Sequence, residues 1–310
     1  MMNHQHTQTL SGPALLEALA YGAALPELAS ANLDGCKLNA FPDGLLEQTD
    51  LTLLSLYDNQ LGAVPAGIAR LRDLKTLNLG ENQLTSVPDG LGRLEDLEML
   101  DLGHNQLSAL PASLGGLTRL VFLYLSNNRL DSLPDALAGL SRLRYLNVTD
   151  NAFRELPGWI GRLGSLVELR VYNNALTGLP EELGTLSQLV ELHAYKNRIT
   201  TLPKSIGQLS ALVKLDLQSN QITALPQSIG ALGRLSELNL RFNALSALPA
   251  SITRLQSLEY LDLRANALRD LPDELDRLTR LRKIDLRWNR LAAYPRCLEA
   301  LARRGCIVYV

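Results

Sequence analysis

Residues 51–65 read LTLLSLYDNQLGAVP, and the pattern returns at residues 74–88 as LKTLNLGENQLTSVP and at residues 97–111 as LEMLDLGHNQLSALP. The interval is 23 residues. An asparagine recurs at this interval along the chain, at Asn59, Asn82, Asn105, Asn128, Asn151, Asn174, Asn197, Asn220, Asn243, Asn266 and Asn289. Cys36 holds the same place one interval earlier, so the sequence contains twelve units without insertion or deletion. Such a fixed period indicates a repeat architecture, in which each unit stacks on its neighbours.

Each unit follows the pattern L-x-x-L-x-L-x-x-N-x-L-x-x-L-P-x-x-[IL]-G-x-L-x-x. In its L-x-L segment, alternate side chains point to opposite faces of a strand, so the leucines face inward and the residues between them face solvent. A proline follows the asparagine by six residues in every unit, from Pro42 through Pro295. Because proline lacks an N–H and fixes φ, it ends the strand pairing and begins the return path.

This unit resembles the leucine-rich repeat over about residues 28–303. Its LP-x-x-[IL]-G form is similar to the Ras-group branch of that family, which includes plant intracellular Ras-group-related proteins and bacterial relatives. The resemblance implies an α/β solenoid: a horseshoe of twelve 23-residue repeats with a concave parallel β-sheet, short helical or extended convex segments, and N- and C-terminal caps. The family is a general binding scaffold, so the resemblance implies binding without naming a partner. The glycine of the pattern is replaced at Ala69, Ala138, Thr253 and Asp276.

The ends of the repeat array carry segments that predict caps. We expect a disordered tail over residues 1–12, an amphipathic capping helix over 13–27, repeats over 28–303 and a capping strand over 304–310. If the 23-residue interval continues to the end, Ile307 and Tyr309 take the two inward strand positions.

The repeated asparagine has a structural role in this scheme. It lies at the turn that leaves the strand, where its side-chain amide offers two donors and an acceptor to backbone groups. Stacked amides would form a ladder between neighbouring units, with Cys36 on the first rung.

The composition argues against several classes of function. Among 310 residues, 30 are Lys or Arg and 32 are Asp or Glu, and this net charge of −2 argues against a nucleic-acid binder. No secretory signal and no apolar run of membrane-spanning length occurs, so we expect a cytoplasmic monomer without a membrane partner. The Gln/Thr/His-rich start leaves open a leader for a dedicated secretion system that delivers the protein into a host cell.

The sequence carries none of the motifs that bring catalytic chemistry. It has no G-x-x-x-x-G-K-[ST] loop, no H-E-x-x-H and no C-x-x-C. An enzyme centred on Glu168, Arg170, Glu191 and His193 remains a rival, but nothing orders these residues as nucleophile, base and oxyanion donor. We therefore predict a non-catalytic protein with no cofactor and no metal. Cys297 and Cys306 fit small buried residues better than catalytic ones.

The solvent-facing strand positions hold a concentration of aromatic side chains. The chain has 9 Tyr, 4 Phe and 2 Trp, and nine of these lie at such positions, five of them in four consecutive units. Large side chains suit a half-exposed sheet, yet Tyr, Trp and Arg also dominate interface hot spots. We predict a partner-binding patch composed of Phe122, Tyr124, Tyr145, Glu168, Arg170, Tyr172, Glu191, His193, Tyr195 and Lys196. In the same region the last inward leucine becomes Val148, Val171 and Ala194, and Phe153 can refill the volume.

Towards the C-terminal end the solvent-facing positions carry charge in columns. Aspartates occupy one column and arginines the next, and Trp288 lies beside them. This secondary charged surface comprises Asp216, Arg241, Asp262, Arg264, Asp285, Arg287 and Trp288. Strands about 4.8 Å apart bring the columns close enough to neutralise one another. The pattern fits either a self-neutralising ladder or a polar extension of the binding face for a charged partner.

Taken together, these patterns predict a non-catalytic protein–protein interaction module that binds a protein or peptide on its concave face. The alternative is a bacterial secreted effector or adaptor that supports an enzyme or signalling complex of a host. The Ras-group resemblance implies small GTPases or signalling complexes as partners, and a ubiquitin pathway is another candidate. No residue of this sequence can be matched individually to a partner-binding residue of that branch.

Overall fold

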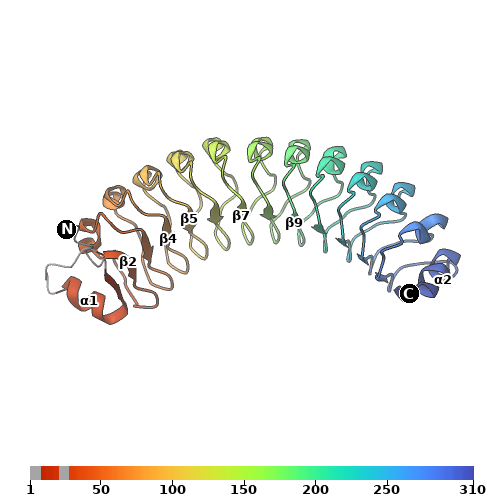
Figure 1. Ribbon diagram of the computed structural model, residues 1–310, viewed down its shortest axis with the longest axis horizontal. Coiled ribbons are helices and arrows are strands. Elements are labelled where there is room, and N and C mark those ends of the chain that lie inside the picture. Colours follow the sequence, from red (N-terminus) through yellow and green to blue (C-terminus); the bar gives the residue numbers. More distant parts are fainter. Residues whose placement is uncertain (1–7, 21–27) are drawn as a thin grey trace, which may run out of the picture. The chain divides into compact units, whose positions relative to one another are not determined.

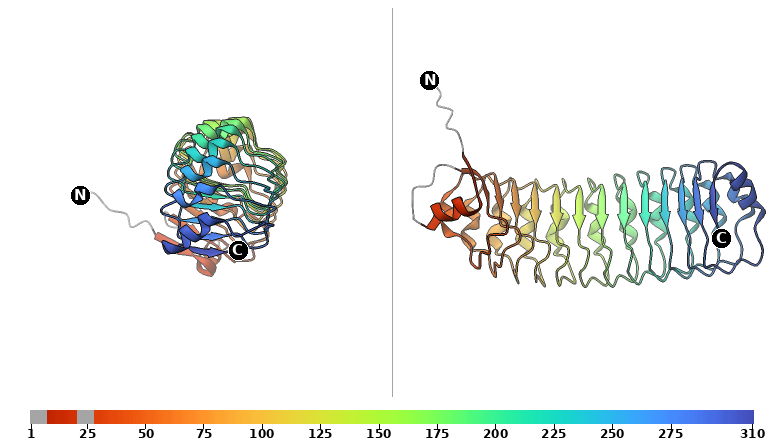
Figure 2. Two further views of the ribbon diagram at one scale, coloured as in Figure 1. Left: turned by 90° about the vertical axis from the view of Figure 1, so that its right-hand side faces the viewer. Right: turned by 90° about the horizontal axis from the view of Figure 1, so that it is seen from below.

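The computed structural model describes residues 8–20 and 28–310, and the chain divides into two compact units, Met1–Asn151 and Ala152–Val310. Within each unit a short strand on one side alternates with a short helix on the other (Figure 1). Seen from below, the strands of each unit lie side by side (Figure 2). We call the solvent side of these strands the strand face.

The described residues of the first unit form the strands β1 (Gln8–Ser11), β2 (Leu28–Asn32), β3 (Leu53–Ser55), β4 (Thr76–Asn78), β5 (Met99–Asp101), β6 (Phe122–Tyr124) and β7 (Tyr145–Asn147). Its helices are α1 (Gly12–Ala20) and the 3-10 helices η1 (Asp43–Glu47), η2 (Ala66–Arg70), η3 (Asp89–Arg93), η4 (Ala112–Gly116) and η5 (Asp135–Gly139). The strands pair in parallel and in sequence order.

The second unit contains β8 (Glu168–Arg170), β9 (Glu191–His193), β10 (Lys214–Asp216), β11 (Glu237–Asn239), β12 (Tyr260–Asp262), β13 (Lys283–Asp285) and β14 (Ile307–Tyr309), again parallel and in order. Its helices are η6 (Gly158–Arg162), η7 (Glu181–Thr185), η8 (Lys204–Gln208), η9 (Gln227–Ala231), η10 (Ala250–Arg254), η11 (Asp273–Arg277) and the α-helix α2 (Arg296–Arg303).

The repeat proline and glycine account for the 3-10 helices. Each helix starts directly after the proline, as at Pro88, whose carbonyl accepts a hydrogen bond from the amide of Leu91 at 3.0 Å. Neighbouring 3-10 helices approach so closely that a Cβ at Gly92 would lie 2.0 Å from the carbonyl oxygen of Ser113. The glycine therefore permits the tight packing of one repeat on the next.

The inward leucines form the core, as the alternation of the strands predicts. Leu54, Leu77 and Leu100 are paired in register on β3, β4 and β5 and are fully buried. Phe153 is also fully buried, and so are the smaller Val171 and Ala194 on neighbouring repeats. Burial of Phe153 is consistent with the expectation that its ring fills volume left by the smaller inward residues.

The predicted asparagine ladder is confirmed. Asn82 is 8% exposed. Its Nδ2 donates to the carbonyl oxygens of Leu56 (2.9 Å), Leu79 (3.1 Å) and Gly80 (3.0 Å). Its Oδ1 accepts from the amide of Leu61 at 3.0 Å. One side chain thus satisfies backbone groups of two successive repeats that would otherwise be buried without partners.

The residue before the asparagine adopts a left-handed backbone conformation. From Asp58 (φ 54°) to Trp288 (φ 63°), every ladder asparagine follows such a residue. The turn places this residue's side chain at the rim of the strand face. Asn, Asp and His tolerate this conformation better than bulky residues do, so the identity of the residue there is informative.

The N-terminal end differs in part from expectation. Helix α1 ends at Ala20, and residues 21–27 of the expected helix lie outside the described residues. Leu15 on α1 is fully buried, as a capping role requires. Residues 8–11, expected within a disordered tail, form strand β1, which pairs with β2 through Thr9↔Ser30 and Ser11↔Asn32. Residues 1–7 lie outside the described residues.

The expected inward orientation of Ile307 and Tyr309 is wrong. Both are exposed, because β14 pairs with β13 as Ile307↔Lys283 and Val308↔Ile284, an offset of 24 residues. The connection from β13 to β14 contains the α-helix α2 and a left-handed Gly305 (φ 88°). It is one residue longer than the connections that contain a 3-10 helix. A one-residue slip exchanges the two faces of a strand, so Ile307 and Tyr309 lie on the strand face.

Replacing Asn82 by Leu should lower the free energy of unfolding by about 2 kcal/mol or more, because several buried backbone groups lose their partners. Urea denaturation measures this as a lower midpoint. The neighbouring exposed Gln83→Ala is the matched control and should leave the midpoint unchanged. Equal midpoints for both variants would show that the ladder contributes nothing to stability.

Candidate functional site

In the first unit, three aromatic side chains of the predicted patch meet on the strand face. Phe122 and Tyr124 extend from β6 and Tyr145 from β7. The ring of Tyr145 lies 4.8 Å from that of Tyr124 and 6.4 Å from that of Phe122, centroid to centroid, at tilted angles. Phe122 is exposed and the two tyrosines are half-buried. The three rings form a continuous aromatic cluster on adjacent strands.

In the second unit, Tyr172 and Tyr195 stack on each other. They follow β8 and β9 by two residues, and their ring centroids are 4.1 Å apart with an angle of 9° between the planes. Burial, and then the neighbouring Tyr172 hydroxyl, raises the pKa of Tyr195, so the ring stays neutral at physiological pH. The stack offers a flat, neutral and half-exposed surface. Lys196, next to Tyr195, is exposed at its rim.

Four charged residues of β8 and β9 form an ion-pair group beside the stack. Glu168 pairs with Glu191, and Arg170 with His193, across the two strands. The Nε of Arg170 donates to Glu168 Oε1 at 2.5 Å, and His193 Nε2 lies 2.8 Å from Glu191 Oε2 and 3.9 Å from Glu168 Oε1. Adjacent like charges repel, and the contacts of Glu168 with Arg170 and of Glu191 with His193 offset that repulsion.

The same group has the donor types of a divalent-cation site. The ligand atoms of Glu168, Glu191 and His193 all lie within 4.8 Å of one another, and His193 is buried. However, Arg170 already binds Glu168, and Glu191 already binds His193. The geometry therefore describes a closed ion-pair group in which the two carboxylates have cationic or imidazole partners.

The predicted patch of ten residues is divided between the two units. Phe122, Tyr124 and Tyr145 belong to the first, and the other seven belong to the second. Each set lies together on the strand face of its own unit, which is the side that the alternation of the strands predicted.

In the secondary charged surface, two of the three arginines form ion pairs with aspartates. Arg264 binds Asp262 through two nitrogens at 3.0 and 2.5 Å, and Arg287 binds Asp285 in the same way at 2.9 and 2.7 Å. Asp285 is 2% exposed and also lies 3.5 Å from Arg264. Arg241 differs: among the described residues it has no ion pair, and its buried Nε has no hydrogen-bond partner. A self-neutralising ladder therefore does not account for Arg241.

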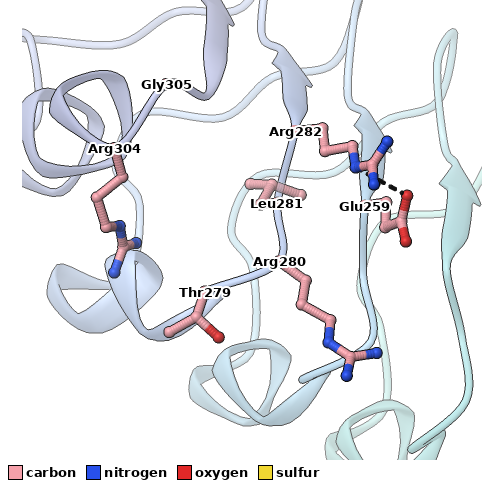
Figure 3. A pocket seen from close by; sticks show the side chains of 7 residues that line it. All are labelled: Glu259, Thr279, Arg280, Leu281, Arg282, Arg304 and Gly305. Atoms are coloured by element: carbon pink, nitrogen blue, oxygen red, sulfur yellow. Dashed lines mark ion pairs between the residues drawn. The ribbon is translucent and has the colours of Figure 1, made fainter.

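Two hollows in the surface could not be predicted from the sequence. One, of about 260 Å³, lies on the strand face of β10–β12, where Asp216 and Asp262 are joined by Lys214, Glu237 and Tyr260. Periodicity placed these side chains on the strand face, but depth depends on how neighbouring side chains lean. The other, of about 430 Å³, is seen in Figure 3 and is lined by Glu259, Thr279, Arg280, Leu281, Arg282, Arg304 and Gly305. Its arginines come from connecting segments, which carry no strand signal.

Further features of the described residues bear on catalysis and membranes. Cys297 and Cys306 are free and buried, and burial raises the pKa of both thiols, which disfavours the reactive thiolate. Among the described residues, no helix has the length and apolar character needed to cross a bilayer.

Comparison with family models identifies the class of protein. The leucine-rich repeat model matches residues 49–107, 72–130, 108–153 and 164–222, and the leucine-rich repeat region model matches residues 194–303. The chain belongs to the leucine-rich repeat family. No curated protein sequence matches it.

Solved structures with the same fold come from several kinds of organism. A leucine-rich repeat protein of Leptospira interrogans is 29% identical, with 97% of this chain and 89% of that chain covered and a TM-score of 0.71. The Arabidopsis receptor kinase HAESA, solved with the peptide hormone IDA and the co-receptor SERK1, is 30% identical over 86% of this chain and 51% of that chain, with a TM-score of 0.69. An internalin of Listeria monocytogenes is 22% identical, covers 96% and 94%, and has a TM-score of 0.71, which shows the fold alone.

The Asp285 carboxylate makes a pH-dependent contribution to stability. Burial raises its pKa, but the hydrogen bonds from Arg287 and the charge of Arg264 outweigh burial, so the pKa lies below the ordinary value. The ionised form then favours folding above the unfolded-state pKa of about 3.9, and this contribution is lost as the pH falls through the lower folded-state pKa.

We therefore expect Asp285→Asn to destabilise the protein by about 1–2 kcal/mol at pH 7. This value is kept small because solvent around Arg287 screens the ion pair. Urea denaturation should show the difference from the unsubstituted protein shrinking below about pH 4. A difference that stays constant down to pH 3 would contradict the ion-pair assignment.

Proposed function

We propose that the protein is a non-catalytic interaction module that binds a protein or peptide segment on the strand face, the concave side of its repeats. The observation that carries this proposal is the Tyr172–Tyr195 stack on β8–β9 with its adjoining ion-pair group. The inward leucines and the ladder hold the fold together, and neither requires aromatic rings at these positions. The similarity to HAESA, solved with a peptide hormone, supports a peptide or protein as partner.

Physical reasons favour these residues as contact points. Both tyrosines directly follow strands of a hydrogen-bonded sheet and stack on each other, so little conformational entropy is lost when a partner docks. Each ring offers apolar area and a hydroxyl, which is why tyrosine is common at interface hot spots. Arg170, Glu191 and Lys196 surround the stack and would orient a partner through complementary charge. The aromatic cluster of the first unit, around Tyr145, is proposed as a further part of the binding surface.

A second candidate is an adaptor or secreted effector of a bacterium that supports a host enzyme or signalling complex. The 29% identity to a Leptospira interrogans leucine-rich repeat protein over nearly the whole chain favours a bacterial source. The LP-x-x-[IL]-G pattern supports assignment to the Ras-group branch, for which small GTPases are the proposed partners. Both candidates use the same binding surface and differ in the partner.

The test is affinity capture from an extract of the cells in which the protein acts, with the intact chain beside the double variant Tyr172→Ala/Tyr195→Ala. Loss of one hot-spot aromatic costs about 2 kcal/mol, or roughly thirtyfold in affinity. The double variant should therefore fail to retain a partner of micromolar affinity. Loss of the ring–ring interaction should cost about 0.5–1.5 kcal/mol of stability, so the variant stays folded.

The matched control is Gln208→Ala at the end of η8, an exposed residue on the opposite side of the same unit. It should capture the partner as the intact chain does. If the double variant captures the partner as fully as the intact chain does, and a variant of the helix side does not, then the strand face around the stack is not the site. An unfolded double variant would assign the two tyrosines to the fold instead.

A further inference from the structure

Two bulky aromatic residues occupy left-handed turn positions in the second unit. Phe242 (φ 55°) and Trp288 (φ 63°) directly precede the ladder asparagines of their repeats and are 47% and 65% exposed. In the other repeats the residue before the ladder asparagine is polar, except for one alanine, and none is a bulky apolar residue. These residues are Asp58, Glu81, His104, Asn127, Asp150, Asn173, Lys196, Ser219 and Ala265. A large ring in this conformation costs backbone strain and exposes apolar area, so the fold alone does not explain either residue.

The two rings converge over a small residue. Ala265 holds the same position in the repeat between them, and it too is left-handed. Three successive strands about 4.8 Å apart would separate Phe242 from Trp288 by about 10 Å, yet the ring centroids are only 6.4 Å apart, with planes at 22°. The rings lean toward each other across the alanine methyl. An apolar side chain that lies over Ala265 would contact both of them.

Cationic side chains surround these rings. The guanidinium carbon of Arg241 lies 5.8 Å from the Phe242 ring, and that of Arg287 lies 5.8 Å from the Trp288 ring. The guanidinium carbon of Arg287 also lies 4.9 Å from the ring centroid of Tyr309, one of the two strand-face residues of β14. The surface therefore presents aromatic rings and arginines together, which is the composition of an interface core.

The charge of this surface is positive. Its cations are Arg241, Arg264, Lys283 and Arg287, and its carboxylates are Glu237, Asp262 and Asp285. Asp262 binds Arg264, and Asp285 binds Arg287 and lies 3.5 Å from Arg264. Among the described residues Arg241 has no ion pair, and unlike the other cations of this surface it has a buried nitrogen, Nε, that lacks an acceptor. A buried donor without an acceptor costs free energy. By turning toward an incoming carboxylate, Arg241 would gain charge-assisted hydrogen bonds.

We propose that the surface formed by Arg241, Phe242, Ala265 and Trp288 binds an acidic peptide segment in which a carboxylate side chain is followed closely by an apolar one. The carboxylate binds Arg241, and the apolar side chain lies over Ala265 between the two rings. This surface is separate from the Tyr172–Tyr195 stack, and its binding does not depend on what the stack binds.

The test measures fluorescence anisotropy of fluorescein-labelled, C-terminally amidated peptides GEEYEEG, GEEAEEG and GKKYKKG. Amidation removes the terminal carboxylate, so only side-chain carboxylates are probed. GEEYEEG should bind about tenfold more tightly than GEEAEEG, and GKKYKKG should not bind. Arg241→Gln should weaken both acidic peptides about tenfold. Trp288→Asn should reduce the affinity for GEEYEEG to that for GEEAEEG.

Two matched controls come from the same unit: Arg254→Gln at the end of η10, and Tyr294→Ala, an exposed aromatic residue outside the strand face. Neither should change the affinities. Tyr172→Ala/Tyr195→Ala should also keep GEEYEEG binding, which separates failure of this proposal from failure of the proposed function.

Thermal unfolding distinguishes a binding role of Trp288 from a structural one. Asparagine suits a left-handed position, so Trp288→Asn should melt at or above the temperature of the unsubstituted protein while losing the preference for GEEYEEG. A lower melting temperature with unchanged binding would make the ring structural and overturn the proposal. Equal binding of GKKYKKG would overturn it too. Self-association of the protein that Trp288→Asn abolishes would also overturn the proposal, because the surface would then bind a second copy of the chain.

Discussion

The hydrogen bonds of the ladder asparagine are the interaction on which the rest of each unit depends. A strand of three residues that turns away from its neighbours leaves inward-facing carbonyls and amides that water cannot reach. In Asn82 one side chain serves three carbonyls and one amide, and the same set of bonds recurs at Asn105 and Asn220. Because this bonding is local to each turn, the repeats keep a fixed register, and many strand-face positions, such as those of Tyr172 and Tyr195, are left free of that structural role.

That freedom explains why function can reside on the strand face. Inward positions are restricted to apolar residues by burial, and the return path is restricted by the proline and by the close approach at residues such as Gly92. Most solvent-facing strand positions meet neither restriction, although Asp285 and His193 are buried. The tyrosine stack of β8–β9 and the arginine–aromatic surface near β13 are both built from such positions and from the left-handed residue that follows each strand. The two surfaces differ in chemistry, since one is a neutral stack beside a closed ion-pair group and the other is cationic.

The period of 23 residues predicted the strands, the buried leucines and the ladder, because each depends on spacing alone. Spacing failed where the return path changed: α2 with Gly305 adds one residue, and Ile307 and Tyr309 therefore face solvent. Strand β1 was missed because a four-residue edge strand outside the repeats carries no period. The sequence placed Tyr172 and Tyr195 on the correct face but gave no sign of their stacking. It also could not distinguish the paired Arg264 from the unpaired Arg241, because pairing depends on side-chain conformation.

The central claim is that the repeats bind their partner through strand-face side chains. Hydroxyl-radical footprinting of the chain with and without its captured partner tests this claim most directly, since it reports solvent access of individual side chains. Oxidation of Tyr172 and Tyr195 should fall on binding, while Trp159 on η6 and the exposed Tyr294 should be oxidised at unchanged rates. Protection of Trp159 with unchanged oxidation of Tyr172 and Tyr195 would place the partner on the helix side and contradict binding through the strand face.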